Sequence, residues 1–270
     1  MKASKSIFTV LVLALVLLPG LLLTTRSMAG MPIDTGWDGT LRRLRVPVLM
    51  YHYISVPPPD ADPIRLDLSV RPDNFRKQME WLRQKGYQTI TPDELAAALL
   101  RGAALPTRPI LLTFDDGYAD AYTTAFPILK EMGFTGTFFV VSSFIDSGRG
   151  DYLTWTQARE MVEAGMYVQN HSRSHKDMRG RDHAWLADQI GVAQDRIEQS
   201  TGIRPRFFCY PSGEYDDTTV RELQSGGYMA AFTTNDGTFA YTDDMLRIPR
   251  VRIRGSTSLE RFAYLIAWVR

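Results

Sequence analysis

The stretch PILLTFDDGY, residues 109–118, joins a continuous apolar run to two adjacent acids. The run at 109–114 has the length and composition of a strand buried on both faces, as strands of parallel sheets are. Asp115 and Asp116 follow it directly, and Gly117 permits a turn. A turn alone explains an Asp-Gly pair but not the doubled acid, because like charges repel and burying either one is costly without a compensating cation. The stretch therefore predicts a buried parallel strand that ends at a cation site.

Strand-like and helix-like segments alternate on both sides of this stretch. The strand-like segments are residues 45–53, 86–90, 109–114, 135–141, 166–170, 206–210, 228–234 and 246–253, and the helix-like segments are residues 72–85, 91–102, 121–133, 154–165, 182–202, 215–227 and 256–270. Regular β/α alternation predicts an α/β fold with a parallel sheet covered by helices. About eight strands in roughly 225 residues favour a closed or nearly closed barrel, in which the chemistry lies at the carboxyl ends of the strands.

The composition is that of an ordinary globular protein. The chain has 270 residues, of which 44% are hydrophobic and 23% charged, and its formal net charge is +1. Such a balance gives no reason to expect a nucleic-acid partner. Cys209 is the only cysteine, which excludes an internal disulfide and a zinc site built from several cysteines. Any metal must therefore be held mainly by histidines and carboxylates.

The first 29 residues have the pattern of a secretory signal peptide. Two lysines precede an apolar run at 7–23, and small residues follow it at a position suited to cleavage. The run is short for a membrane span and is interrupted by Pro19-Gly20, although a retained anchor, with membrane attachment through this segment, is the alternative. We expect a location outside the cytoplasm, whether secreted, periplasmic or in the cell envelope. A linker at 30–44 and one catalytic domain at 45–270 are expected to follow.

Three of the four histidines fall at or just beyond the carboxyl end of a predicted strand. His52 ends the first strand, and His171 and His175 follow the strand at 166–170. Parallel strands would bring these residues and the acids at 115–116 to one rim. One aspartate and two histidines form a ligand set suited to zinc, with positions left open for water. Each element alone has a simpler interpretation as a turn, a polar surface loop or a buried hydrogen-bonded histidine, but their combination favours a metal site.

The segments TFDDGY (113–118), HSRSH (171–175) and YPSGEY (210–215) resemble the first three motifs of the polysaccharide deacetylases, carbohydrate esterase family 4 with the NodB homology domain. The resemblance covers residues 46–270. The opening VPVLMYHYI and the late RIPRVRI are similar to the branch that deacetylates poly-N-acetylglucosamine. The resemblance implies a distorted (β/α)7-type barrel, the NodB homology fold. It also implies metal-dependent removal of N-acetyl groups from an N-acetylglucosamine-containing polysaccharide, either an exopolysaccharide or a cell-wall glycan, with release of acetate.

By motif match, Asp115 would be the general base. The ligands of a divalent metal ion, for which we expect zinc, would be Asp116, His171 and His175. In the poly-N-acetylglucosamine branch a histidine of the opening strand is the general acid, and His52 matches it. A nearby carboxylate is expected to raise the pKa of His52, which would keep the imidazole protonated.

The chain departs from the family pattern at two positions. The third motif usually carries an arginine where this chain has Cys209, and Arg250 would supply the missing guanidinium from a neighbouring strand. No histidine occurs after His183, so the usual late histidine is absent as well. An inactive carbohydrate-binding relative is therefore one alternative, although retention of the base and all three ligands argues against it. A polysaccharide O-acetyl esterase is the other.

The motif YPSG suggests further contacts with the polysaccharide substrate. A backbone N–H of this turn, that of Ser212, would help the metal to stabilise the oxyanion. Exposed aromatic residues at the rim would stack on sugar rings or, as an equally good interpretation, simply pack; the candidates are Tyr118, Tyr210 and Tyr215. No obligate protein partner is inferred.

Overall fold

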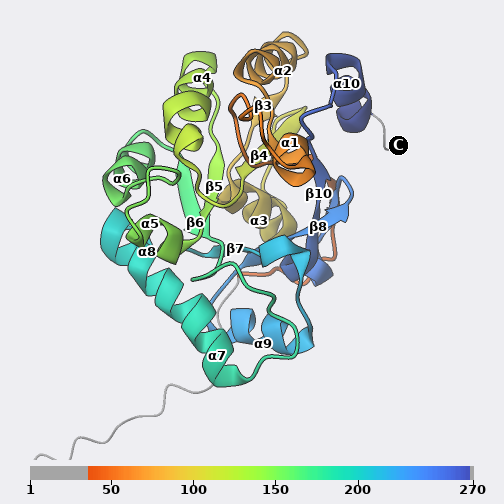
Figure 1. Ribbon diagram of the computed structural model, residues 1–270. Helices are drawn as coiled ribbons and strands as arrows, with labels where there is room; N and C mark the ends of the chain where they lie inside the picture. Colours follow the sequence, from red (N-terminus) through yellow and green to blue (C-terminus); the bar gives the residue numbers. More distant parts are fainter. Residues whose placement is uncertain (1–35, 268–270) are drawn as a thin grey trace, which may run out of the picture. The chain divides into compact units, whose positions relative to one another are not determined.

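A computed structural model of the protein describes residues 36–267 (Figure 1). The predicted signal peptide or anchor at 1–29 and the first part of the predicted linker lie outside the described residues. Among the helices within 36–267, none combines the length and apolarity needed to cross a bilayer.

Seven parallel strands close into a barrel because β2 (Val48–Tyr51) pairs with both β4 (Pro109–Phe114) and β10 (Ile248–Arg252). The other four strands of the ring are β5 (Thr137–Val140), β6 (Tyr167–Asn170), β7 (Phe207–Cys209) and β8 (Ala230–Asp236). A further short strand, β3 (Gln88–Thr89), pairs with β4 outside the ring. The predicted closed barrel of the (β/α)7 type is confirmed.

Helices surround the ring of strands (Figure 1). The longer helical segments are α2 (Pro72–Gln84), α3 (Pro92–Arg101), η1 (Ala121–Ala125) with α4 (Phe126–Met132), α6 (Trp155–Glu163), α7 (His183–Ala187) with η2 (Asp188–Val192) and α8 (Ala193–Thr201), α9 (Asp217–Ser225) and α10 (Leu259–Ala267). Two short helices, α1 (Pro63–Leu68) and α5 (Ser142–Asp146), lie in connections that follow strands. Local sequence sets these limits: α3, for example, begins with a capping box of Thr91 and Glu94 and ends at left-handed Gly102.

Alternation along the strands divides the core into two layers and directs the acids inward. In β4, Ile110, Leu112 and Phe114 belong to the cluster that packs against the surrounding helices. Leu111 belongs to the cluster inside the barrel, and with a period of two Thr113 and Asp115 face the interior as well. Asp115, which follows the carboxyl end of β4, therefore lies inside the barrel.

An antiparallel pair that we did not predict lies beside the barrel. In it β1 (Arg43–Arg45) pairs with β9 (Phe239–Tyr241). Upstream of β1, the Asp38 N–H donates to the Leu100 carbonyl, and Arg42 Nη1 donates to the Leu99 carbonyl. Residues 38–44, at the carboxyl end of the expected linker, therefore contact α3 and β9.

Candidate active site

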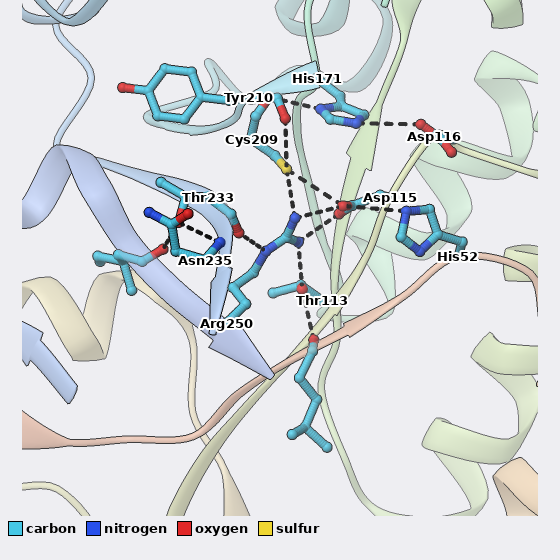
Figure 2. A network of polar contacts seen from close by, with 12 residues as sticks. His52, Thr113, Asp115, Asp116, His171, Cys209, Tyr210, Thr233, Asn235 and Arg250 are labelled. Atoms are coloured by element: carbon cyan, nitrogen blue, oxygen red, sulfur yellow. Dashed lines mark hydrogen bonds and ion pairs between the residues drawn. The ribbon is translucent and has the colours of Figure 1, made fainter. Parts of the chain in front are cut away.

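The Asp-Asp-Gly turn separates the two acids that the sequence places side by side. The Asp115 N–H donates to the Tyr51 carbonyl and so continues the β2–β4 ladder. Asp116 and Gly117 then adopt left-handed backbone angles, with φ of 72° and 73°. This sharp turn sends Asp115 toward Arg250 and Asp116 toward His171 (Figure 2). The two adjacent acids thus have different partners, a guanidinium beside Asp115 and two imidazoles beside Asp116.

Backbone strain is concentrated at this rim. Among the described residues, the non-glycine positions with positive φ are Asp116, Ser172, His175 and Ser212. Two of these are predicted metal ligands, one lies between ligands, and one is the predicted oxyanion donor. Such conformations cost of order 1–3 kcal/mol each and persist where the surrounding structure enforces them, most often at functional sites.

Asp116, His171 and His175 are brought together as a potential metal centre. Asp116 Oδ1 lies 3.3 Å from His171 Nε2 and 3.2 Å from His175 Nε2. One ligand atom from each residue lies within 4.8 Å of the others. Asp116 Oδ1 is buried and has no hydrogen-bond partner, as expected of an atom that a cation would satisfy. The donor set and geometry fit a divalent metal such as zinc.

The imidazole of His171 is held in the tautomer that a metal ligand needs. Its Nδ1 lies 2.7 Å from the Cys209 carbonyl oxygen and donates to it, which leaves the Nε2 lone pair free. The backbone of the loop is fixed in the same way, since Asn170 Oδ1 accepts from the Ser172 N–H and Ser172 Oγ accepts from the His175 N–H. The His171 ring and the backbone of the loop that carries His175 are therefore held in place by hydrogen bonds within the protein.

A π-helical turn, η2, is hydrogen-bonded to the loop that joins His171 and His175. Its Gln189 side chain accepts bonds from the Ser174 N–H and hydroxyl, and its Gln189 carbonyl accepts from the Arg173 N–H. The Ile190 carbonyl accepts from Asn170 Nδ2. Single π turns within helices frequently occur at functional sites. No sequence pattern signals this supporting role, because Gln189 lies inside an ordinary amphipathic helical segment.

Asp115 and Arg250 form a fully buried ion pair (Figure 2). Arg250 Nη1 lies 2.8 Å from Oδ1 of Asp115, and Nη2 lies 2.7 Å from Oδ2. Two further N–H groups of the guanidinium donate to Thr113 Oγ1 and the Thr233 carbonyl. Burial alone would raise the pKa of Asp115, but Arg250 outweighs it and lowers that pKa to about 2. Asp115 is therefore a carboxylate held rigidly on its strand.

Cys209 completes this network. Its Sγ accepts from Arg250 Nη2 at 3.1 Å and lies 3.5 Å from Asp115 Oδ2. Burial raises the pKa of Cys209 well above its usual value, so the group is a neutral thiol. Arg250 thus supplies from β10 the guanidinium that the resemblance places at position 209, where the small thiol leaves space for it.

His52 lies at the same rim, with Nε2 3.9 Å from Asp115 Oδ2. The expected direction of its pKa shift is wrong. Burial lowers the pKa of His52, and the opposing effect of Asp115 and Asp116 does not compensate. Nδ1 of His52 is buried without a hydrogen-bond partner, which further disfavours a resting imidazolium. His52 is therefore neutral at rest.

A cavity of about 540 Å³ opens over these groups. Its lining includes His52, Asp115, Asp116, His171, His175 and Ser212. The turn at Ser212 depends on Gly213, where φ is +76° and a Cβ would lie 2.0 Å from Thr234 Oγ1. These six residues, all predicted from the sequence as site residues, thus face one space, and the buried Arg250 is not part of its lining.

Two of the three tyrosines considered as sugar platforms, Tyr118 and Tyr210, line the cavity and have packing partners. Tyr210 is fully buried, and its hydroxyl donates to the Leu246 carbonyl while its ring stacks on Tyr215. The ring of Tyr118 is stacked between Tyr53 and Tyr152. Neither Tyr118 nor Tyr210 offers a free ring face to a sugar, so the packing interpretation holds for both.

Comparison with known proteins agrees with this arrangement. The family model for polysaccharide deacetylase matches residues 102–231. A putative polysaccharide deacetylase, YxkH of Bacillus subtilis, is 30% identical over 236 residues, which cover 86% of this chain and 80% of the relative. The poly-beta-1,6-N-acetyl-D-glucosamine N-deacetylase of Escherichia coli K12 is 27% identical over 75% of this chain, but the match covers only 36% of that longer protein.

A solved structure gives the same result. The Streptococcus pyogenes deacetylase PplD, solved in complex with acetate, superposes with a TM-score of 0.77 at 30% identity and covers 83% of this chain and 99% of its own. With the closed barrel and the rim chemistry described above, these matches show that the chain belongs to the polysaccharide deacetylase family, the carbohydrate esterases of family 4, whose members are hydrolases.

Proposed function

We propose that this protein removes N-acetyl groups from an N-acetylglucosamine-containing polysaccharide and releases acetate. The observation that carries the proposal is the pairing of a potential metal centre, Asp116 with His171 and His175, with the oriented carboxylate of Asp115 in one cavity. An amide needs both an activated carbonyl and a protonated leaving nitrogen, and this site holds groups for each task. The N-deacetylase activity named for the Escherichia coli relative supports the choice of substrate.

The metal, for which zinc is the proposed occupant, would polarise the amide carbonyl and lower the pKa of water when bound. Asp116, His171 and His175 would hold it. The Ser212 N–H would donate to the carbonyl oxygen as negative charge develops there. Asp115, fixed by Arg250, would accept the proton that the attacking water loses.

His52 would deliver that proton to the departing nitrogen. Because His52 is neutral at rest, the proton must reach it during the reaction, and Asp115 Oδ2 lies 3.9 Å away. The single proton lost by water is then the one that the amine gains, and both groups return to their resting states. Arg250 would act as a positioning residue that holds Asp115 without touching the substrate.

Acetate release from defined polymers tests the proposed function. We expect release from β-1,6-linked N-acetylglucosamine oligomers, none after treatment with a chelator, and recovery after zinc is added. Release from O-acetylated xylan alone would replace the proposal with a polysaccharide esterase. Failure of the zinc-loaded protein to release acetate from any of these substrates, with retained binding to the oligomers, would identify an inactive carbohydrate-binding relative.

Replacement of His52 by alanine is expected to reduce turnover by about 10²–10⁴-fold, because the leaving nitrogen loses its proton donor. Metal content, folding and substrate affinity should remain close to those of the wild type. His183→Ala is the matched control, since His183 is largely exposed and pairs with Glu222 away from the cavity. A folded, zinc-loaded His52→Ala protein with normal turnover would contradict the role.

We also propose that the protein works outside the cytoplasm, either released by signal cleavage or retained by its first segment. The support is the apolar run at 7–23 with its lysine-rich start.

A further inference from the structure

Arg252 lies in the wall of the candidate active-site cavity and has no ionic partner among residues 36–267. It lines the cavity and is partly buried. Its two neighbours of like charge on the same chain segment are both paired, Arg250 with Asp115 and Arg254 with Asp67. Within residues 36–267, the Arg252 guanidinium has neither a hydrogen bond nor an ion pair. A partly desolvated charge of this kind is unfavourable unless a ligand compensates it.

The strand directs Arg252 toward the substrate. Arg250 and Arg252 are alternate residues of β10 and therefore share a face. Arg250 reaches into the barrel below Asp115, whereas Arg252 lies one step nearer the open carboxyl end. In the β2–β10 ladder it pairs with Met50, two residues before His52. Arg252 thus lies at the rim beside the group that faces the leaving nitrogen.

Among the charged side chains that line the cavity, Arg252 is the cation that no carboxylate neutralises. The Asp115 and Asp67 carboxylates are neutralised by Arg250 and Arg254, and Asp116 is assigned to the metal. Deacetylation leaves an amine that becomes cationic, and a nearby unmatched guanidinium would disfavour that product by like-charge repulsion. A negative group on the substrate would remove this penalty.

We propose that Arg252 forms a subsite for an anionic group, a carboxylate or a phosphate ester, carried by the N-acetylated sugar or by the unit next to it. The guanidinium fork matches either anion with two parallel hydrogen bonds. The inference rests on the proposed deacetylation and narrows it to acidic glycans. Arg252 then determines specificity and takes no part in proton transfer.

Ligand binding to the zinc-loaded full-length protein tests the subsite. The probes are N-acetylglucosamine, N-acetylmuramic acid and N-acetylglucosamine 1-phosphate, with dissociation constants measured by NMR titration. Wild type is expected to bind the two anionic sugars roughly 10- to 100-fold more tightly than the neutral one. Arg252→Gln should remove this preference and leave binding of the neutral sugar unchanged. Arg83→Gln, which removes an exposed charge from α2, should keep it.

The two anionic probes show which kind of negative group the subsite recognises. If only N-acetylmuramic acid is preferred, the subsite recognises a carboxylate. If only N-acetylglucosamine 1-phosphate is preferred, the subsite recognises a phosphate ester. A preference that survives in Arg252→Gln would overturn the proposal, because the metal alone would then be binding the anion. Equal loss of neutral and anionic binding in that variant would overturn it as well.

Measurement of acetate release distinguishes failure of the subsite proposal from failure of the deacetylation proposal. If Arg252→Gln still releases acetate from neutral oligomers while losing its preference for anions, both proposals stand. If wild type shows the anion preference but releases no acetate from any substrate, the deacetylation proposal fails and the subsite remains.

Discussion

Arg250→Met is expected to destabilise the protein by about 3–5 kcal/mol, because it leaves the Asp115 carboxylate buried without its partner. Turnover of the fraction that remains folded should fall sharply as well, since nothing then holds Asp115 in place. Denaturant unfolding and acetate release measure the two effects. Arg247→Met provides the control: Arg247 forms its ion pairs, with Asp217 and Asp244, at the surface, and its loss should change stability by no more than about 1 kcal/mol.

A second variant separates stability from catalysis. In Asp115→Leu/Arg250→Met both charges are replaced by apolar side chains, and much of the lost stability should return because no unpaired ion remains. Turnover should not return, because the base is gone. Equal stability of the wild type and Arg250→Met would show that the buried pair is not formed as described.

Asp115→Asn is expected to lower turnover by about 10²–10⁴-fold while zinc content stays at the wild-type level. The amide cannot accept the proton from water, and the three ligands are untouched. Metal analysis and acetate release on the same sample provide the measurement. Some loss of stability should accompany the change, because Arg250 loses its charged partner.

Asp67→Asn is the matched control for this variant. Asp67 also lines the cavity, but it pairs with Arg254 and lies outside the predicted catalytic set. Its replacement should leave turnover within a few-fold of the wild type. Turnover of Asp115→Asn close to that of the control would exclude Asp115 as the base, and loss of zinc from it would make Asp115 part of the metal centre instead.

The sequence was most informative where a local pattern coincides with a structural rule. The apolar run before Asp115 required a buried strand, and β/α alternation placed its carboxyl end at the same rim as those of the other strands. Strand alternation then determined which of the two acids faces the interior. Closure of the barrel followed from the number of strands in the available length.

Properties set by packing across the barrel could not be predicted in this way. The pKa of His52 depends on how completely its ring is buried, and burial outweighs the carboxylates that the sequence places nearby. Whether the ring of Tyr210 faces solvent depends on Leu246 and Tyr215. The support of the histidine loop by Gln189 arises from a π turn, which has no signature in hydrophobic periodicity.

The seam between β2 and β10 joins the two ends of the domain, since Leu49 pairs with Val251. Asp115 and Arg250 are likewise separated by 135 positions along the chain. Contacts of such long range form only after most of the chain is ordered, and proteins rich in them fold slowly. During biosynthesis the base therefore remains without its guanidinium until the last strand is made. The catalytic rim is a product of complete folding, and no amino-terminal fragment that lacks β10 contains it.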